Sequence, residues 1–441
     1  MYRSKLPNGV SEADRRSLLF GLGVDSEKYS RPFIAVINSW NEAAPGSIHL
    51  RDVVSRVKKG IQDAGGIPFE TPTMGLCDGI ALANPKYITP SRDLIANEVE
   101  VIMEANQFDA MVLVGNCDKI LPAYLMAAGR LDLPAIFVTG GYMRVGRHND
   151  APCTFLDIGK AVGKFESGQI GHDELEAIIE SACVSSGACS MIGTANTMSC
   201  IVESLGMSLP GNATVPAEGN RILEYGYQAG VKIVQLLKDG VTSRKIITNE
   251  SMRNTIRMVM AIGGSSNVLV HIPAIATESE LDIDCLEEFD QAKSKVPLLV
   301  GLAPNIGGYL MPDFDRAGGL PALFNQLTHD KLIDSNVLTC TGKTASENWS
   351  GAEVKDVSVI RPLSKPFQTT GGLAVLRGNI APDGCVVKQT AVAPEMLVFE
   401  GRAKVFWGEE AAQNALESGQ IKSGDIVFIL GMGPKGGPGL I

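Results

Sequence analysis

The chain has 441 residues, more than a single hydrophobic core normally holds, which predicts two domains. Its formal net charge of −10 at pH 7 disfavours a nucleic acid or an anionic membrane surface as a partner. No apolar run approaches the roughly 18 residues of a membrane span, and the first residues lack a signal-peptide pattern. We therefore expect a cytoplasmic protein that acts on a small molecule.

In the first part of the chain, short apolar runs alternate with helical patterns. We predict strands at residues 32–40, 110–117 and 134–141, and helices at residues 50–66, 91–107 and 121–131. Continuous apolar strands separated by helices are typical of a parallel sheet that is covered on both faces. The fold class predicted here is therefore α/β, with a large, doubly wound domain.

The middle of the chain, from about residue 173 to 260, is mostly helical in pattern. The clearest helices are predicted at 194–206 and 219–240, and a helix–strand alternation follows over 261–278. We assign all of this to the large domain, which we expect to span residues 1–355.

After Trp349 the pattern changes to short β-type runs separated by Gly, Pro and Asp. These runs lie at 357–363, 371–379, 384–392 and 425–430, with one helical segment near 408–418. They predict a smaller, β-rich domain over residues 370–441. The chain ends in a glycine-rich loop directly after an apolar strand, so we expect this second domain to be incomplete.

The nine cysteines are scattered and odd in number, which argues against a disulfide framework. Three of them lie in segments suited to a site. Cys117-Asp118-Lys119 follows the strand at 110–117, Cys77-Asp78 precedes a glycine turn, and Cys189 lies in a loop of small residues before a helix. Ligands collect at the carboxyl ends of strands in open α/β sheets, so these residues predict a site.

Each of these residues also has an ordinary structural interpretation. Cys117 is also compatible with a core thiol, Asp118 with a helix cap, Lys119 with a solvated residue and Asp78 with a turn residue. Carboxylates from two strand ends suit a hard cation such as Mg²⁺, whereas the thiolates of Cys117 and Cys189 suit iron–sulfur metal.

A series of segments resembles, in order, the signature blocks of the dihydroxy-acid and sugar-acid dehydratase family. They are NSWNEAAPGSIHL, CDGIA, SRDLIAN, VGNCDKILPAYLMAAGRLDLPAIFVTGG, GTANTM, GGSSN, AGG and GPKGGPG. The resemblance covers nearly the whole chain. It implies a hydro-lyase with an iron–sulfur cluster and Mg²⁺, a homodimer, and a second domain that resembles a swivelling β-barrel.

The resemblance also implies roles for individual residues. Cys117 and Cys189 match cluster ligands, Asp78 and Asp118 match magnesium ligands, and Lys119 matches a lysine that carries a carbamate. A carbamate turns a cation that would repel Mg²⁺ into one more oxygen ligand.

The sequence departs from the family pattern in three places. Members with a two-iron cluster have a third cysteine where this chain has Gly46, and members with a four-iron cluster have Gly-His there, whereas Ser47 follows here. The cluster type, 2Fe–2S or 4Fe–4S, is therefore open, with Cys77 as a candidate for an extra ligand. The segment ALANPKYITPSR also differs, which leaves substrate contacts there open. The family's magnesium-binding glutamate and base serine are expected beyond Ile441.

The leading interpretation is dehydration of a 2,3-dihydroxy acid of the 2,3-dihydroxyisovalerate type to a 2-keto acid in branched-chain amino-acid biosynthesis. A sugar-acid dehydratase acting on an aldonate or 6-phosphogluconate is the alternative within the family. A catalytically incomplete fragment, or a paralogue that only binds metal or an acid, is the alternative from another class.

A further set of polar residues lies in the signature loops, with either a site role or a structural role. His49 is interpreted as a helix-start residue or a neighbour of the site, and the small polar residues as turn formers or substrate contacts. This set comprises His49, Thr194, Asn196, Ser265 and Asn267.

Overall fold

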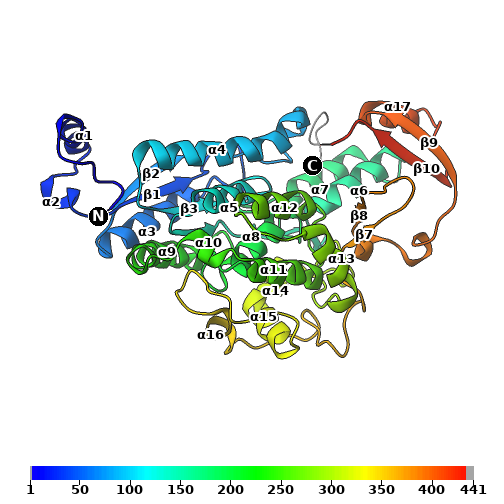
Figure 1. The fold of residues 1–441 in the computed structure, drawn as a ribbon. Helices are drawn as coiled ribbons and strands as arrows, with labels where there is room; N and C mark the ends of the chain where they lie inside the picture. Colours follow the sequence, from blue (N-terminus) through cyan, green and yellow to red (C-terminus); the bar gives the residue numbers. More distant parts are fainter. Residues whose placement is uncertain (1, 434–441) are drawn as a thin grey trace.

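The computed structural model describes residues 2–433, and its centre is a parallel four-stranded sheet (Figure 1). The strand order is β2-β1-β3-β4. The strands are β1 (Phe33–Asn38), β2 (Ile67–Pro72), β3 (Ala110–Gly115) and β4 (Ala135–Thr139). Every residue of β1, β3 and β4 is buried, as expected for parallel strands covered on both faces.

Helices cover both faces of this sheet. In Figure 1, α4 (Ile88–Asn106) runs along one side, while α3 (Leu50–Asp63) and α9 (Asn220–Asp239) lie on the other. Helix α5 (Ile120–Leu131) follows β3 and packs against α4, and α8 (Thr194–Ser204) packs against α5 and β4. The doubly wound α/β domain predicted from the sequence is thus confirmed.

The helices outside this central layer are shorter on average. They are α1 (Val10–Gly21), α2 (Ser26–Tyr29), α6 (Phe155–Glu166), α7 (His172–Ala182), α10 (Ser243–Ile246), α11 (Asn249–Ile262), α12 (Val268–Glu278), α13 (Cys285–Lys295), α14 (Met311–Arg316), α15 (Gly319–His329) and α16 (Ala345–Trp349). Short 3₁₀ turns occur at η1 (Ala81–Ala83), η2 (Pro85–Tyr87), η3 (Asn212–Thr214), η4 (Gln389–Ala391) and η5 (Pro394–Met396). No helix within residues 2–433 is both long enough and apolar enough to cross a membrane.

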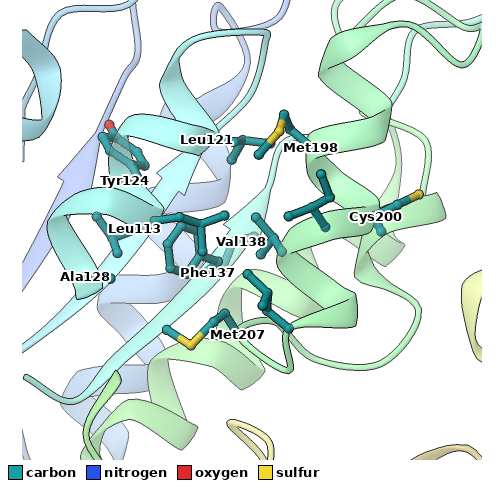
Figure 2. Packing of buried hydrophobic residues seen from close by; sticks show 14 of the residues in the cluster. Leu113, Leu121, Tyr124, Ala128, Phe137, Val138, Met198, Cys200 and Met207 are labelled. Carbon is teal, nitrogen blue, oxygen red and sulfur yellow. The ribbon is translucent and has the colours of Figure 1, made fainter. Parts of the chain in front are cut away.

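Figure 2 shows how the core joins the sheet to the helix layer. Phe137 and Val138 of β4 lie between side chains of α5, including Leu121, and side chains of α8, including Met198. All four side chains are buried. The continuous apolar pattern of β4 therefore allows this strand to pack against two helices, α5 and α8. This packing holds α8 in place, and α8 in turn positions the loop that precedes it.

A strand-rich region follows the α/β domain and lies at one end of the molecule in Figure 1, opposite α1 and α2. Strands β7 (Ala374–Leu376) and β8 (Cys385–Val387) pair antiparallel, whereas β9 (Arg402–Trp407) and β10 (Asp425–Leu430) pair parallel beside α17 (Glu409–Glu417). A hairpin of β5 (Gly146–His148) and β6 (Ala151–Cys153) lies in the first part of the chain. The predicted β-rich C-terminal region is confirmed, and its closure into a barrel stays a prediction.

Three details differ from the sequence-based expectations. Strand β2 and strand β9 were not predicted, because both are partly exposed and their sequences lack a continuous apolar pattern. The strand expected within 261–278 is wrong, since α12 continues as a helix through Pro273. An apolar run of this length does not distinguish a buried helix from a strand. Residues 357–363 contribute one isolated bridge, from Ile360 to Val300, and no strand.

Helices α3 and α9 cross at glycines. A Cβ atom added to Gly60 would lie 2.1 Å from the carbonyl oxygen of Tyr227, and one added to Gly230 would lie 2.2 Å from that of Val57. Backbone atoms cannot yield as a flexible side chain can. The two glycines therefore set how closely α3 approaches α9, and through it the sheet.

This close approach predicts a specific loss of stability. We expect Gly60→Ala to lower the free energy of unfolding by about 1–3 kcal/mol, because the added methyl group forces the two helices apart. The matched control is Gly163→Ala in α6, where an added Cβ meets no atom within 4 Å. The control should stabilise the protein slightly through helix propensity. Denaturant unfolding measures both, and equal effects of the two substitutions would contradict this account.

Candidate active site

The carboxyl ends of the parallel strands bring Asp78 and Lys119 together. Asp78 lies in the loop after β2, Lys119 lies in the loop after β3, and β1 runs between these two strands. Lys119 donates a hydrogen bond from Nζ to Asp78 Oδ2 at 2.7 Å. The side chains of Lys119 and Asp78 are only 1% and 7% exposed. This buried ion pair occupies the sheet edge where ligands bind in open α/β folds.

Asp118 adds a second carboxylate beside Asp78. Burial and the negative charge of Asp78 raise the pKa of Asp118, and the positive charge of Lys119 partly opposes this rise. Asp78 Oδ1 is buried and has no hydrogen-bond partner among residues 2–433. Adjacent carboxylates with an unpaired oxygen provide the oxygen-rich environment that Mg²⁺ prefers. The residues present therefore fit a hard cation.

Cys117 and Cys77 form the sulfur side of the same site. Cys117 directly precedes Asp118 and adopts φ 71°, a left-handed conformation that is uncommon outside glycine. A hydrogen bond between the two cysteines lowers the pKa of Cys77, and the same contact together with burial raises the pKa of Cys117. The structure thus places the expected cluster cysteine in contact with the candidate extra ligand, in a strained conformation typical of functional positions.

Cys189 reaches this sulfur side from the loop before α8. Its charge raises the pKa of Cys117, and burial raises the pKa of Cys189 itself to about 12. Asn196 holds the loop by donating from Nδ2 to the carbonyl oxygens of Cys189 and Met191 at 2.5 and 2.7 Å. The two cysteines expected to bind a cluster therefore lie near each other, although they are separated by 72 positions in the numbering (189 minus 117).

Gly46 lies against the cluster cysteine. A Cβ atom at this position would be 2.3 Å from Cys117 Sγ, so any larger residue requires Cys117 to move. Gly46 belongs to the loop after β1, the strand that lies between β2 and β3. The position at which some relatives were expected to have a third cysteine is thus in contact with Cys117.

Family models match the chain in two consecutive parts. A model described as dihydroxy-acid/6-phosphogluconate dehydratase N-terminal matches residues 31–348, and the corresponding C-terminal model matches residues 358–441. The chain belongs to this dehydratase family. Two relatives named dihydroxy-acid dehydratase illustrate the similarity. The protein from Moorella thermoacetica is 44% identical over 442 residues, which cover 100% of this chain and 80% of the relative. The protein from Carboxydothermus hydrogenoformans is 45% identical over 437 residues, covering 99% and 79%.

Some expected features of this dehydratase-family chain lie outside the described residues. All of the GPKGGPG block except Gly433 falls there. The glutamate and the serine expected beyond Ile441 stay predictions. Within residues 2–433, no group of three or more His, Cys, Asp or Glu side chains forms a ready metal site. Asp78 and Asp118 therefore need a further ligand to complete a magnesium site.

His49 supports the site through the backbone. It precedes α3, makes no helix-capping hydrogen bond, and its Nε2 lies 2.7 Å from the carbonyl oxygen of Gly140. A carbonyl oxygen only accepts, so Nε2 carries the proton. Burial lowers the pKa of His49, which keeps the ring neutral. His49 thus joins the loop after β1 to the end of β4.

The other four signature residues hold two loops together. Asn267 donates to Thr194 Oγ1 at 2.8 Å, and Thr194 Oγ1 lies 2.9 Å from Ser265 Oγ. Together with Asn196, these three residues hold the GGSSN loop and the loop that contains Cys189 against the start of α8. Their hydrogen bonds within the protein support a positioning role, and direct contact with substrate stays a prediction.

Sequence reasoning gave His271 no site role, yet its helix α12 packs against α5, which begins after Lys119. His271 is only 1% exposed, and burial, followed by the positive charges of Lys119 and Arg92, lowers its pKa. His271 lies four residues after Asn267, one helical turn beyond a signature loop, and this spacing is the signal that would have identified it.

The buried ion pair predicts a large effect of removing its acid. Asp78→Ala should lower the free energy of unfolding of the metal-free protein by about 3 kcal/mol, because it leaves the charge of Lys119 buried and unpaired. The control is Glu27→Ala, which removes one partner of the exposed Arg31–Glu27 pair. That change should be much smaller. Denaturant unfolding gives both values, and a loss at Asp78 no larger than the control would contradict the proposed importance of the pair.

Proposed function

We propose that this chain is a hydro-lyase that dehydrates a 2,3-dihydroxy carboxylic acid of the 2,3-dihydroxyisovalerate type to a 2-keto acid. The observation that carries the proposal is one sheet edge where two carboxylates and a lysine lie beside two or three cysteines. Relatives 44–45% identical that are named dihydroxy-acid dehydratase support it. On this proposal the chain acts in branched-chain amino-acid biosynthesis.

The oxygen side of the site is proposed to hold Mg²⁺ through Asp78, Asp118 and a carbamate on Lys119. Asp78 already has one unpaired oxygen, and burial together with the negative charge of Asp78 raises the pKa of Asp118. As an ammonium group, Lys119 offers only donors and cannot bind a metal. Its conversion to a carbamate removes one positive charge and supplies oxygen ligands.

The sulfur side is proposed to hold an iron–sulfur cluster through Cys117 and Cys189, with Cys77 as the third cysteine. Thiolates are the preferred ligands of such clusters. Cys77 is the thiol of this group whose pKa is lowered, by the hydrogen bond from Cys117 and by backbone N–H groups of Ile80 and Gly79. The cluster type, 2Fe–2S or 4Fe–4S, stays open in this proposal.

The reaction requires loss of a proton from C2 and of hydroxide from C3 of the acid. Bound Mg²⁺ would neutralise charge that develops beside the substrate carboxylate, and a cluster iron would act as a Lewis acid toward the C3 hydroxyl. Asp78 and Asp118 would hold this cation and thereby orient the carboxylate end of the substrate. The loops held by Asn196 and His49 keep the two halves of the site at a constant separation.

The proposal also includes the substrate class, the oligomeric state and the cellular location. An assay distinguishes a 2,3-dihydroxy acid from an aldonate or 6-phosphogluconate, and the family name covers dihydroxy-acid and 6-phosphogluconate dehydratases. A homodimer and a cytoplasmic location follow from the family resemblance. The alternative, a catalytically incomplete or purely binding protein, retains the metal site without turnover.

Iron binding tests the sulfur ligands. Anaerobically reconstituted protein should retain iron and sulfide, and Cys117→Ser or Cys189→Ser should abolish retention because each removes a cluster ligand. Cys77→Ser should lower the retained iron, while Cys385→Ser, an exposed cysteine in β8, should not change it. Wild-type protein without iron would refute the cluster, and unchanged iron in Cys77→Ser would refute the third ligand.

Turnover tests the function as a whole. With Mg²⁺ present, the reconstituted chain should form keto acid from 2,3-dihydroxyisovalerate faster than from a panel of aldonates and 6-phosphogluconate, and EDTA should abolish the activity. Faster dehydration of a sugar acid would move the chain to the other branch. Bound iron and Mg²⁺ without any keto acid would support the binding-only alternative.

A further inference from the structure

Helix α4 carries an apolar stripe on its exposed side. Tyr87, Leu94 and Val101 are spaced at seven residues and are 60%, 53% and 65% exposed. Residues at this spacing lie on one face of a helix. The opposite face of α4 is apolar too, since Ile95 and Val99 are buried in the core. A helix that is apolar on both sides is normally covered on both sides, yet α4 forms the upper edge of the α/β domain in Figure 1.

The turns before α4 extend this apolar surface. η1 and η2 lead directly into α4, and this segment contributes Ile80 and Leu82, which are 56% and 50% exposed. We call Ile80, Leu82, Tyr87, Leu94 and Val101 the α4 face. At roughly 100 Å² each, these five side chains expose on the order of 500 Å². A homodimer interface of standard size buries about 800 Å² per partner, of which about 65% is apolar. The apolar area of the α4 face is therefore what one subunit contributes to such a dimer.

The carboxylates beside the stripe are neutralised within the chain. They form the ion pairs Arg92–Asp93, Arg130–Glu100 and Arg3–Glu104, at 3.0, 2.5 and 2.8 Å. The whole chain has a net charge of −10, which repels a second copy at long range. Because the α4 face carries little of this charge, two copies approach there at a lower electrostatic cost. A strongly charged partner would gain little from the same surface.

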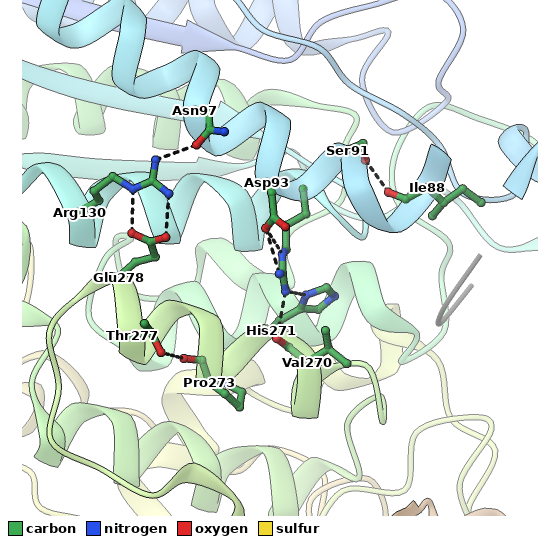
Figure 3. A network of polar contacts seen from close by, with 11 residues as sticks. Ile88, Ser91, Asp93, Asn97, Arg130, Val270, His271, Pro273, Thr277 and Glu278 are labelled. Carbon is green, nitrogen blue, oxygen red and sulfur yellow. Dashed lines mark hydrogen bonds and ion pairs between the residues drawn. The ribbon is translucent and has the colours of Figure 1, made fainter. Parts of the chain in front are cut away.

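Asn97 lies in the middle of the stripe. Helix α4 spans Ile88–Asn106, so position 97 is its midpoint. Asn97 is exposed, and its Oδ1 accepts a hydrogen bond from Arg130 Nη1 at 2.9 Å (Figure 3). A two-fold axis near this point reverses the second helix, so Leu94 faces the half of the stripe that contains Val101 of the partner subunit. A single Asn within an apolar helix interface fixes its register.

The open edge of the sheet is less suited to pairing two copies. Edge strand β2 uses the N–H group of Ile67 to bond the carbonyl oxygen of Pro32, on the side of β1. N–H groups alternate between the two sides of a strand, so positions 68, 70 and 72 direct theirs outward. Pro68 and Pro72 have no N–H group. Two of the three outward donors are therefore absent, which disfavours extension of the sheet into a second copy.

We propose that the α4 face binds a second copy of this chain, with the two α4 helices antiparallel across a two-fold axis near Asn97. The proposal rests on the homodimer named in the proposed function and adds the surface through which it forms. Because η1 and η2 lead from Asp78 to α4, the partner copy covers the segment that follows a proposed magnesium ligand. Dimerisation thereby holds this side of the site in place.

Sedimentation equilibrium of the full chain measures the dimer dissociation constant. The wild type should form a particle of twice the chain mass of 46.8 kDa. Leu94→Arg should raise the dissociation constant about a hundredfold or more, because the change acts twice in a two-fold interface and buries a charge there. Far-UV circular dichroism should not change, since Leu94 is exposed in the monomer. The matched control is Leu18→Arg, at a leucine that is 76% exposed on α1, and it should leave the dissociation constant unchanged.

A photo-crosslinking side chain tests the geometry. Isotopically labelled Asn97→p-benzoylphenylalanine protein, mixed with unlabelled chains, should crosslink to residues 88–106 of the other copy, as identified by mass spectrometry.

Four results would each overturn the proposal: a monomeric wild type, an unchanged dissociation constant for Leu94→Arg, equal effects of Leu94→Arg and Leu18→Arg, or crosslinks confined to other segments. Both measurements record mass and contact, so they apply equally to a chain without turnover. Keto acid is assayed separately, which distinguishes failure of the proposed function from failure of the interface.

Discussion

The buried ion pair between Lys119 and Asp78 is the interaction on which the site depends. It joins the loop after β3 to the loop after β2 across the end of β1, so it fixes two strand ends that are not neighbours in the sheet. Removing one member of such a pair leaves an uncompensated charge, whereas a bound cation and a modified lysine would replace the pair by coordination. The same residues therefore stabilise the empty site and form the proposed metal site.

The helix layer makes this arrangement rigid. Arg130 of α5 forms a bidentate pair with Glu278 of α12, at 2.7 Å for each bond, and also binds Asn97 of α4 (Figure 3). It forms a further ion pair with Glu100 of α4. These contacts raise the pKa of Arg130 and fix the positions of α4, α5 and α12 relative to one another.

Each of two loops carries one cysteine and one aspartate of the proposed site. Cys77 and Asp78 are adjacent in the chain, as are Cys117 and Asp118, so each loop contributes one residue to the sulfur side and one to the oxygen side. The absence of a side chain at Gly46 leaves room for the thiol of Cys117, a residue with a left-handed backbone conformation. Thiolates suit soft metals and carboxylates suit hard ones, so the two proposed metals would not compete for the same ligands.

The sequence alone determined the α/β architecture and strands β1, β3 and β4, because burial on both faces imposes a continuous apolar pattern. The signature blocks mark the loops of the candidate site, and the roles of its residues stay predictions. It did not predict the partly exposed β2 and β9, whose pairing is decided by neighbouring strands. The contact between Cys77 and Cys117 and the approach of Gly46 to Cys117 were decided only by the tertiary structure, because they join residues far apart in the chain.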